Sequence, residues 1–397
     1  MRHLSSQVCG YLDRASWIRK MFETGAELKA KHGEDAVSDF SLGNPDMPPP
    51  DRIFDAMRQL SEGKGTPFAL GYMPNAGYPE ARAALAGRLA GEQGVDVAPG
   101  DVVITCGAAG AINSLYRAVI DPGDEVITPA PFFVEYGFYV ENHGGVLKPV
   151  PTVPLTFRLD LDAMEAAITE KTRAVLINSP HNPTGVVYSE EELRGLCELL
   201  VKKNEGRERP ILLIADEPYR FLTYDDAKVV SVLPLYPYSV VVSSFSKNLA
   251  LAGERVGYCL VNPAMPGKEE LLAGLVLANR ILGFVNAPAI GQKLMTMAIS
   301  EQVDASVYAQ RREAMAAMLD NAGVRYAMPG GAFYFFPEAP GGDDLAFANA
   351  LQEELILAVP GRGFGTPGYV RLAFCVGREV IDRAVPGFKR AAEKCRA

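Results

Sequence analysis

The sequence is poor in the residues that build disulfide frameworks and metal sites. Its 397 residues include six cysteines and four histidines. The cysteines form no C-x-x-C pair or cluster, and no two histidines have the spacing of metal ligands. We therefore expect no disulfide framework and no metal site, and cysteines that stay reduced.

Long apolar runs and an excess of basic residues are also missing. The N-terminal MRHLSSQVCGYLDRASWIRK has no apolar core of a signal peptide, and no run of about 18 apolar residues follows it. The net charge of -9 and the pI of about 5.2 argue against a nucleic-acid surface. We expect a cytoplasmic protein without nucleic-acid or membrane partners, which holds any anionic ligand with local arginines and helix N-termini.

The length and the apolar pattern predict two α/β domains, because one compact core rarely serves so long a chain. Short apolar runs alternate with helix-length segments such as SEEELRGLCELLVKKN, in which Ser189 is placed to cap the helix. The runs are DVVIT, DEVITP, RAVLINSP, PILLIAD, YSVVVSSFS and RVGYCLVNP. This alternation predicts a mainly parallel sheet covered on both faces, with ligands at the carboxyl ends of its strands.

The pattern changes toward both ends of the chain. Residues 1–50 have the character of an arm and linker, with a helix over about 16–31 before the proline-rich SLGNPDMPPP. Beyond Pro263 the pattern predicts a second α/β segment that contains GGAFYFFPE, YVRLAF and a terminal helix. It also predicts helices over 269–282, 288–300, 304–321 and about 345–354. This part and the arm predict a smaller domain.

Lys247 is the first candidate for chemistry. It follows the apolar run VVVSSFS and emerges where a buried strand ends, where weak hydration lowers the pKa of an amine and makes it a nucleophile. Ser244, Ser246 and Arg255 can hold a phosphate beside it. The alternative is a surface lysine whose stem covers apolar neighbours.

Polar residues also follow two other strands. Asp216 ends PILLIAD, with Tyr219 close behind in ADEPYR. A carboxylate at that depth needs a cation, such as the protonated nitrogen of a pyridine cofactor, unless it caps the following turn. Asn182 is presented by the prolines of NSPHNPTG after RAVLI, although such segments are more often plain loops.

Two segments indicate where a phosphate and an aromatic ring can bind. ITCGAAGAINSLYRAV turns from strand to helix through Gly107, and the free backbone N–H groups there suit an anion. It is neither a P-loop nor a dinucleotide fingerprint, because the G-K-[ST] and G-x-G-x-x-G patterns are missing. Phe133, in PAPFFVEYGFY, can lie against a cofactor ring or belong to a helix core.

Arg371 is a charged residue within the apolar strand GYVRLAF. A buried guanidinium needs an anion. A substrate carboxylate bound through two nitrogens is one such partner, and a structural salt bridge is the other.

The motifs SLGNPD, SPHNPTG, ADEPYR, SFSKNLALAGERVGY and YVRLAF, in this order, resemble the class I/II aminotransferases. These are the aspartate-aminotransferase-like branch of the fold-type-I pyridoxal phosphate enzymes. The resemblance implies an α/β fold, in which a large domain over residues 48–285 holds a mainly parallel seven-stranded sheet between helices. Residues 1–47 would form the N-terminal arm and part of the small domain, and residues 286–397 the small C-terminal domain.

The resemblance also implies a role for each candidate. Lys247 would bind pyridoxal 5'-phosphate as a Schiff base and move a proton between the substrate α-carbon and the cofactor. Asp216 would pair with the ring nitrogen, and Tyr219 and Asn182 would hydrogen-bond the phenolic oxygen. The ring would stack on Phe133, and the substrate α-carboxylate would bind to Arg371, Asn182 and the backbone of Gly43. Around the phosphate the resemblance places Gly107, Ala108, Ala109, Ser244, Ser246 and Arg255.

Tyr72, in GYMPNAGYPE, matches a tyrosine that family members send to the phosphate of a neighbouring subunit. This match implies a homodimer with shared active sites. The implied partners are an amino acid and a 2-oxo acid.

The sequence departs from the family at two positions and lacks a clear dicarboxylate site. Ala109 has no hydroxyl for the phosphate, and Phe133 stands where tryptophan or tyrosine is common. Enzymes specific for dicarboxylates need a second cation. Arg280 lies one position out of register for that role, with Arg14 and Arg19 as weaker candidates, so aspartate specificity does not follow.

We therefore expect an aminotransferase that works in two half-reactions. A carbon–sulfur β-lyase, or another eliminating enzyme of the same fold, would use nearly the same residues. A non-catalytic regulatory domain that senses the cofactor is disfavoured, because only about 40 residues precede the resemblance and they show no helix-turn-helix pattern. A nicotinamide dehydrogenase is disfavoured by the missing glycine fingerprint.

Overall fold

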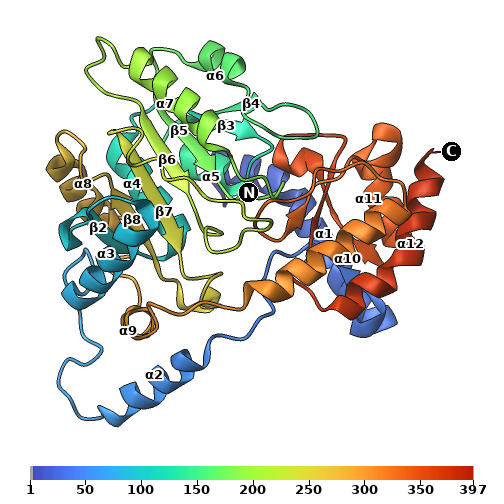
Figure 1. Cartoon of the computed structure of the whole chain (residues 1–397), viewed down its shortest axis with the longest axis horizontal. Helices are drawn as coiled ribbons and strands as arrows, with labels where there is room; N and C mark the ends of the chain where they lie inside the picture. Colours follow the sequence, from blue (N-terminus) through green and yellow to red (C-terminus); the bar gives the residue numbers. More distant parts are fainter. Residues whose placement is uncertain (1–2, 397) are drawn as a thin grey trace.

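The structure is a computed structural model that describes residues 3–396, with the backbone alone for residues 13–22. A seven-stranded sheet forms the centre of its larger part (Figure 1). In spatial order its strands are β2 (Val102–Thr105), β8 (Gly257–Val261), β7 (Ser239–Ser244), β6 (Leu212–Asp216), β5 (Thr172–Asn178), β3 (Glu125–Ala130) and β4 (Val146–Pro151). Strand β8 is antiparallel to both neighbours and all other pairs are parallel. The predicted mainly parallel seven-stranded sheet is confirmed.

The central strands are buried on both faces, which explains their continuously apolar sequences. Along β6, Leu212 and Ile214 pack into one hydrophobic core, and Leu213 and Ala215 pack into another. Side chains alternate in direction along a strand, so the two cores lie on opposite faces of the sheet. The helices of this part are α2 (Asp51–Glu62), α3 (Pro79–Gln93), α4 (Gly107–Val119), α5 (Glu135–Glu141), α6 (Leu161–Ala167), α7 (Glu190–Lys203), α8 (Lys268–Ile281) and α9 (Ala289–Met297).

The smaller part joins the N-terminal arm to the C-terminal third of the chain. Its helices are α1 (Ser6–His32), α10 (Ala305–Asn321), α11 (Asp344–Glu353) and α12 (Arg378–Arg396). Its strands form a parallel pair, β1 (Ser38–Asp39) with β10 (Ile356–Leu357), and an antiparallel sheet of β11 (Val359–Pro360), β12 (Val370–Ala373) and β9 (Tyr334–Phe335). Phe40 of the arm belongs to the same hydrophobic core as Phe335 and Phe388. The arm therefore packs on the C-terminal part of the chain.

Short 3-10 helices connect several of these elements. They span Glu34–Ala36, Pro99–Asp101, Ala252–Glu254, Pro340–Gly342 and Gly361–Phe364.

Helix boundaries differ most from the prediction at the N-terminus. The helix expected over 16–31 begins at Ser6, because the hydroxyl of Ser5 accepts a hydrogen bond from the backbone N–H of Val8 at 3.2 Å and caps it. The domain boundaries at residues 47 and 285 stay predictions. Beyond the second of them, α9 contributes Leu294 and Met295 to the core of the larger part.

Helix α2 and the segment after it extend away from the rest of the molecule (Figure 1). This segment, residues 63–75, is called the extended segment below. Phe68 is 92% exposed and Tyr72 is 95% exposed. Together with Leu70, they form an exposed apolar stretch on this segment.

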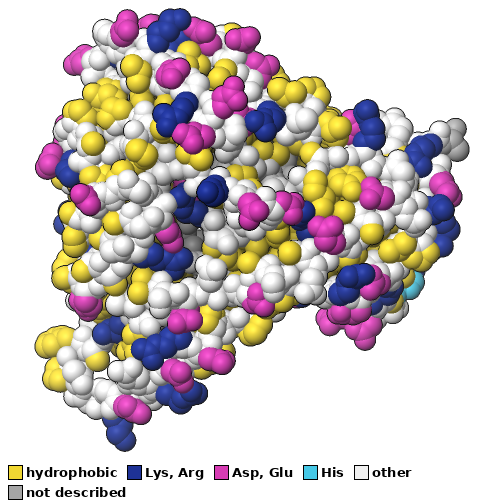
Figure 2. All heavy atoms as spheres, in the orientation of Figure 1, with side chains coloured by type: hydrophobic (Ala, Val, Ile, Leu, Met, Phe, Trp, Pro, Cys, Tyr) yellow, Lys and Arg dark blue, Asp and Glu magenta, His cyan; other side chains and the backbone are white. Residues whose placement is uncertain are grey.

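Acidic and basic side chains are interspersed over the face drawn in Figure 2, and Lys and Arg side chains also surround the hollow near its centre. Within residues 3–396, none of the helices has the length and apolar content needed to cross a bilayer. All six cysteines are free thiols.

Candidate active site

A cavity of about 360 Å³ lies at the carboxyl ends of the parallel strands, between the larger part and the smaller part. Parallel sheets bind ligands at this edge. The predicted site residues that line it are Gly43, Ala108, Ala109, Phe133, Asn182, Asp216, Tyr219, Ser244, Ser246, Lys247, Arg255 and Arg371. The fold thus brings together twelve of the fourteen predicted residues, from segments far apart in the sequence.

Lys247 follows β7 and projects into the cavity. Its Nζ donates a hydrogen bond to the main-chain oxygen of Gly43 at 2.8 Å and lies 5.6 Å from the ring centre of Phe333. Burial, with smaller contributions from the nearby cations Arg371 and Arg255, lowers the pKa of the Lys247 amine to about 8. A neutral amine is therefore accessible near physiological pH, so Lys247 is not an ordinary surface lysine.

Asp216 is the last residue of β6 and is buried at the floor of the cavity. Its Oδ2 accepts a hydrogen bond from the hydroxyl of Tyr136 at 2.5 Å, whereas its Oδ1 is buried without a partner among the described residues. Burial raises the pKa of the Asp216 carboxyl to about 7, an effect that Tyr136 opposes and Glu217 adds to. No helix begins at Asp216, so it does not act as a helix cap.

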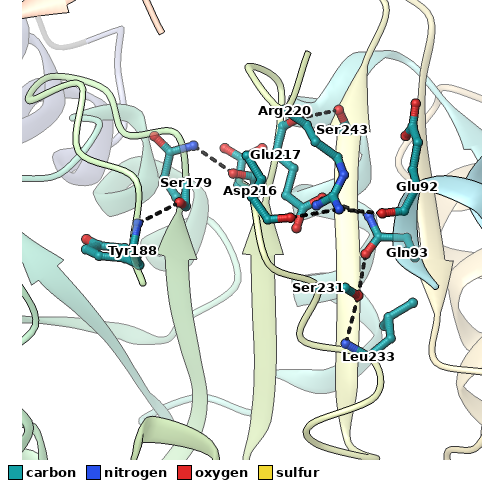
Figure 3. A network of polar contacts seen from close by, with 12 residues as sticks. Glu92, Gln93, Ser179, Tyr188, Asp216, Glu217, Arg220, Ser231, Leu233 and Ser243 are labelled. Atoms are coloured by element: carbon teal, nitrogen blue, oxygen red, sulfur yellow. Dashed lines mark hydrogen bonds and ion pairs between the residues drawn. The ribbon is translucent and has the colours of Figure 1, made fainter. Parts of the chain in front are cut away.

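A buried polar cluster lies on the other side of the turn that carries Asp216 (Figure 3). Glu217 is only 3% exposed, and its Oε2 accepts hydrogen bonds from Gln93 Nε2 at 2.8 Å and Arg220 Nη1 at 3.0 Å. Gln93 in turn accepts a hydrogen bond from Ser231 at 2.6 Å. Arg220 therefore neutralises a second carboxylate next to Asp216 and ties the turn to the end of α3.

The main chain of the same turn is held from both neighbouring strands. Asn178 Nδ2, from β5, donates to the main-chain oxygen of Asp216 at 2.7 Å. Ser243 Oγ, from β7, donates to the main-chain oxygen of Glu217 at 2.9 Å. Successive side chains on a strand point to opposite faces, so fixing this backbone directs Asp216 into the cavity and Glu217 away from it.

Arg371 and Asn182 meet in the same cavity. Arg371 Nη1 donates to Asn182 Oδ1 at 3.1 Å, and Nη2 donates to the main-chain oxygen of Ser41 at 2.7 Å. Its Nε is buried without a hydrogen-bond partner, and no carboxylate of the described side chains pairs with it. The structural salt bridge considered as an alternative is therefore not formed, and the guanidinium can take a carboxylate.

The N-terminus of α4 and Arg255 form a basic end of the site. Gly107 begins α4 with a φ of 70°, and a side chain there would bring Cβ to 2.7 Å from Arg255 Nη2. Gly107 does not itself line the cavity, but its lack of a side chain lets the guanidinium approach the helix N-terminus. Free N–H groups, a helix dipole and an arginine at one place suit a phosphate.

Four candidate residues lie away from this cavity or have side chains outside the described part of the structure. Tyr72 is in the extended segment and does not reach the site of its own chain. Arg280 is exposed and lines a separate pocket with Asn75 and Leu277. Arg14 and Arg19 fall within residues 13–22, whose side chains are not described.

Sequence reasoning missed several aromatic residues of the site, above all Tyr136 and Tyr334, both of which line the cavity. Tyr136 follows Phe133 in PFFVEY and makes an edge-to-face contact with it at 5.4 Å. Its spacing of three residues from Phe133 places it on the same helical face, but such a spacing is equally consistent with a hydrophobic core. Nothing in GGAFYFFPE indicates that Tyr334 reaches a strand end of the other domain.

The family described as "Aminotransferase class I and II" matches residues 35–388, which is most of the chain.

The chain belongs to the class I and II aminotransferases.

Individual relatives agree over nearly the full length. The probable aspartate/prephenate aminotransferase of Aquifex aeolicus is 34% identical, with 93% of each chain covered. The aspartate aminotransferase of Bacillus subtilis is 33% identical over 93% of this chain and 94% of its own. Among solved structures, an aminotransferase from Eubacterium rectale superposes with a TM-score of 0.95 at 38% identity, covering 100% of both chains. The Thermus thermophilus aspartate aminotransferase with maleate has a TM-score of 0.85 at 29% identity, covering 98% of this chain and 100% of its own.

The aminotransferase is therefore a pyridoxal phosphate enzyme that moves an amino group between an amino acid and a 2-oxo acid. The predicted family, fold, reaction and cofactor are confirmed. Three features of the cavity fit this cofactor. The unpartnered oxygen of Asp216 can accept from a protonated ring nitrogen, Lys247 offers an amine, and Arg255 with the α4 N-terminus suits the phosphate.

Proposed function

We propose that Lys247, Asp216 and Tyr219 are the catalytic residues of this aminotransferase. The strongest support is the buried Oδ1 of Asp216, which has no partner among the described residues and belongs to a carboxylate in the same cavity as Lys247. A buried carboxylate oxygen without a donor is costly unless a ligand supplies one. A protonated pyridine nitrogen is a donor of the right charge.

Each of these side chains has a task that its surroundings explain. The bound cofactor supplies an electron-withdrawing ring that stabilises negative charge at the substrate α-carbon. Asp216 keeps the ring nitrogen protonated, because a buried anion favours a neighbouring cation. Lys247, with a pKa lowered to about 8, can take the α-proton as a neutral amine and return it. Tyr219 and Asn182 orient the ring through its phenolic oxygen.

The remaining residues bind and orient. Arg371 holds the substrate α-carboxylate together with Asn182 and the backbone of Gly43, which fixes the α-carbon beside Lys247. Phe133 packs against one face of the ring. The phosphate is held by Gly107, Ala108, Ala109, Ser244, Ser246 and Arg255.

We propose that the enzyme is a homodimer in which Tyr72 of one subunit completes the phosphate site of the other. The exposure of Phe68, Leu70 and Tyr72 on the extended segment supports this arrangement. A two-fold interface would bury both copies of the segment and place each Tyr72 at the partner's site. We also propose a cytoplasmic location, which the six free thiols support.

The relatives' names make aspartate the first amino donor to test. Among the described side chains, the cations that line the cavity are Lys247, Arg255 and Arg371. Each already has a task at the amino group, the phosphate or the α-carboxylate. A preference for aspartate would therefore require a further cation, from the partner subunit or from Arg14 or Arg19 of the N-terminal arm, and a donor with an uncharged side chain would not.

Borohydride reduction of the holoenzyme tests the role of Lys247. We expect the cofactor to become fixed to the peptide that contains Lys247, and the Lys247→Ala variant to fold but lose at least about 10³-fold in turnover. Lys228→Ala, an exposed lysine after ADEPYR, serves as the control and should keep both properties. Labelling of another lysine would overturn the assignment.

Cofactor absorbance then separates transamination from elimination. An amino donor alone should change the spectrum, and a 2-oxo acid should restore it, because the amino group is stored between the two half-reactions. Release of ammonia and a 2-oxo acid without an acceptor would instead identify a β-lyase. The same assay with aspartate, glutamate, alanine and aromatic amino acids gives the donor preference.

A further inference from the structure

Tyr334 joins parts of the active site that come from both ends of the chain. It lies on β9 in the smaller part, is only 2% exposed, and lines the cavity beside residues of the larger part. Within the described residues, the hydroxyl of Tyr334 has one hydrogen-bond partner, the hydroxyl of Tyr219, at an oxygen–oxygen distance of 2.9 Å. A buried tyrosine hydroxyl normally donates one hydrogen bond and accepts another. Which of the two tyrosines donates in this pair therefore decides what each hydroxyl can still bind.

The number of protons on the two hydroxyls decides which tyrosine is the donor in this pair. Burial raises the pKa of Tyr334 to about 12 and that of Tyr219 well above its ordinary value, so both hydroxyls stay protonated near neutral pH. Each hydroxyl has one proton to donate. If Tyr219 donates its proton to the phenolic oxygen of the cofactor, Tyr334 must be the donor to the oxygen of Tyr219.

Tyr334 also contacts the residues that are proposed to bind the substrate α-carboxylate. The guanidinium carbon of Arg371 lies 5.0 Å from the ring centre, a cation–π contact. The hydroxyl packs so closely on Gly43 that any side chain at position 43 would collide with it. Gly43 in turn accepts the hydrogen bond from Lys247 at 2.8 Å. One side chain therefore touches Tyr219, Arg371 and the backbone that holds Lys247.

We propose that Tyr334 is a positioning residue of the transamination site, which donates its hydroxyl proton to Tyr219 and thereby leaves the single proton of Tyr219 for the cofactor phenolic oxygen. This inference rests on the proposed roles of Lys247 and Tyr219. Hydrogen bonds in a chain strengthen one another, so a donor to Tyr219 makes Tyr219 itself a better donor.

The test is a pH titration of the visible absorbance of the bound cofactor in the Tyr334→Phe variant. A donor at the phenolic oxygen favours the deprotonated form of the cofactor–lysine linkage, in which that oxygen carries more negative charge. We therefore expect the midpoint to rise by about half a pH unit, the size of one weakened hydrogen bond. The matched control is Tyr236→Phe, which removes a buried hydroxyl that donates to Ile211 at 2.6 Å beyond the other end of β6.

A second variant background separates an effect through Tyr219 from a general loosening of the site. In Tyr219→Phe, the further change Tyr334→Phe should leave the midpoint unchanged, because the acceptor of its proton has gone. An unchanged midpoint in the single Tyr334→Phe variant would overturn the proposal, as would equal shifts in both backgrounds. Borohydride labelling of Lys247 is measured in the parent enzyme and in each variant. If labelling fails in the parent enzyme, the proposed function is refuted, and this result is distinct from a failure of the proposal for Tyr334.

Discussion

The part of the cavity around Asp216, where the cofactor ring is proposed to bind, is called the ring end below. The ring end and the extended segment are built in opposite ways. At the ring end, side chains from β5 and β7 hold the main-chain oxygens of Asp216 and Glu217, and Gln93 of α3 holds the Glu217 carboxylate. In the extended segment, Phe68 and Tyr72 are almost fully exposed and lie away from the cavity. One region is preorganised by the fold of a single chain, whereas the large side chains of the other face solvent in that chain.

This difference supports the proposed division of tasks between the two subunits. Catalytic groups must be held within a fraction of an ångström, which is achieved most readily at the ends of buried strands packed on both faces. A side chain that only adds a hydrogen bond to a phosphate can come from a second copy of the chain. Its geometry is then set by the interface.

Replacing Asp216 with asparagine should produce the largest effect, because it removes the one charge at the preorganised end that can pair with the ring nitrogen. An amide cannot hold that nitrogen protonated, so we expect turnover to fall by about 10²–10³-fold. Steady-state and single-turnover kinetics measure the loss. The control is Asp160→Asn, which keeps a side-chain oxygen at the N-terminus of α6. Turnover within a few-fold of the parent enzyme would show that Asp216 is not the ring-nitrogen partner.

Asp216 should lower the stability of the cofactor-free protein as the pH rises from about 4 to about 7. The pKa of Asp216 is raised from its ordinary value to about 7 by burial, so in this range the folded state binds more protons than the unfolded state. Under that condition the free energy of unfolding falls with increasing pH, here by up to a few kcal/mol. Urea unfolding of the cofactor-free parent and Asp216→Asn proteins isolates the effect, since the variant lacks this titration. Parallel pH profiles of unfolding free energy for the two proteins would contradict the prediction. When both proteins are saturated with cofactor, the difference in shape between their pH profiles should disappear.

Mixed dimers test whether the extended segment serves the partner's site. The Tyr72→Ala variant should bind the cofactor about tenfold more weakly, and Lys247→Ala should be inactive. The two variants are then unfolded, mixed and refolded together. Each dimer with one subunit of each variant should contain one site in which both Tyr72 and Lys247 are native. Roughly a quarter of all sites should then regain full cofactor affinity and turnover. No recovery beyond the sum of the two separate proteins would place Tyr72 in the site of its own subunit or outside any site.

Most of the ring end could be predicted from the sequence, because its residues follow apolar runs that end at one edge of a sheet. Lys247, Asp216 and Asn182 come directly after or close behind such runs, and parallel strands bring their ends together. Arg371 was detectable as a charge in an apolar strand, which needs an anion in any fold. Tyr136 and Tyr334 were not detectable in this way, because a tyrosine in an aromatic segment is as consistent with a hydrophobic core as with a site.

The sequence by itself determined the fold class, the chemistry of the strand ends and the family that the motifs resemble. These depend on local properties, namely apolar periodicity, backbone breaks at glycine and proline, and charges in unfavourable places. Only the tertiary structure decided which carboxylate oxygen of Asp216 is left without a partner, that Tyr334 shares a hydrogen bond with Tyr219, and that Tyr72 points away from its own site. Those facts depend on the packing of segments distant in the chain, where a shift of about one ångström makes or removes a hydrogen bond.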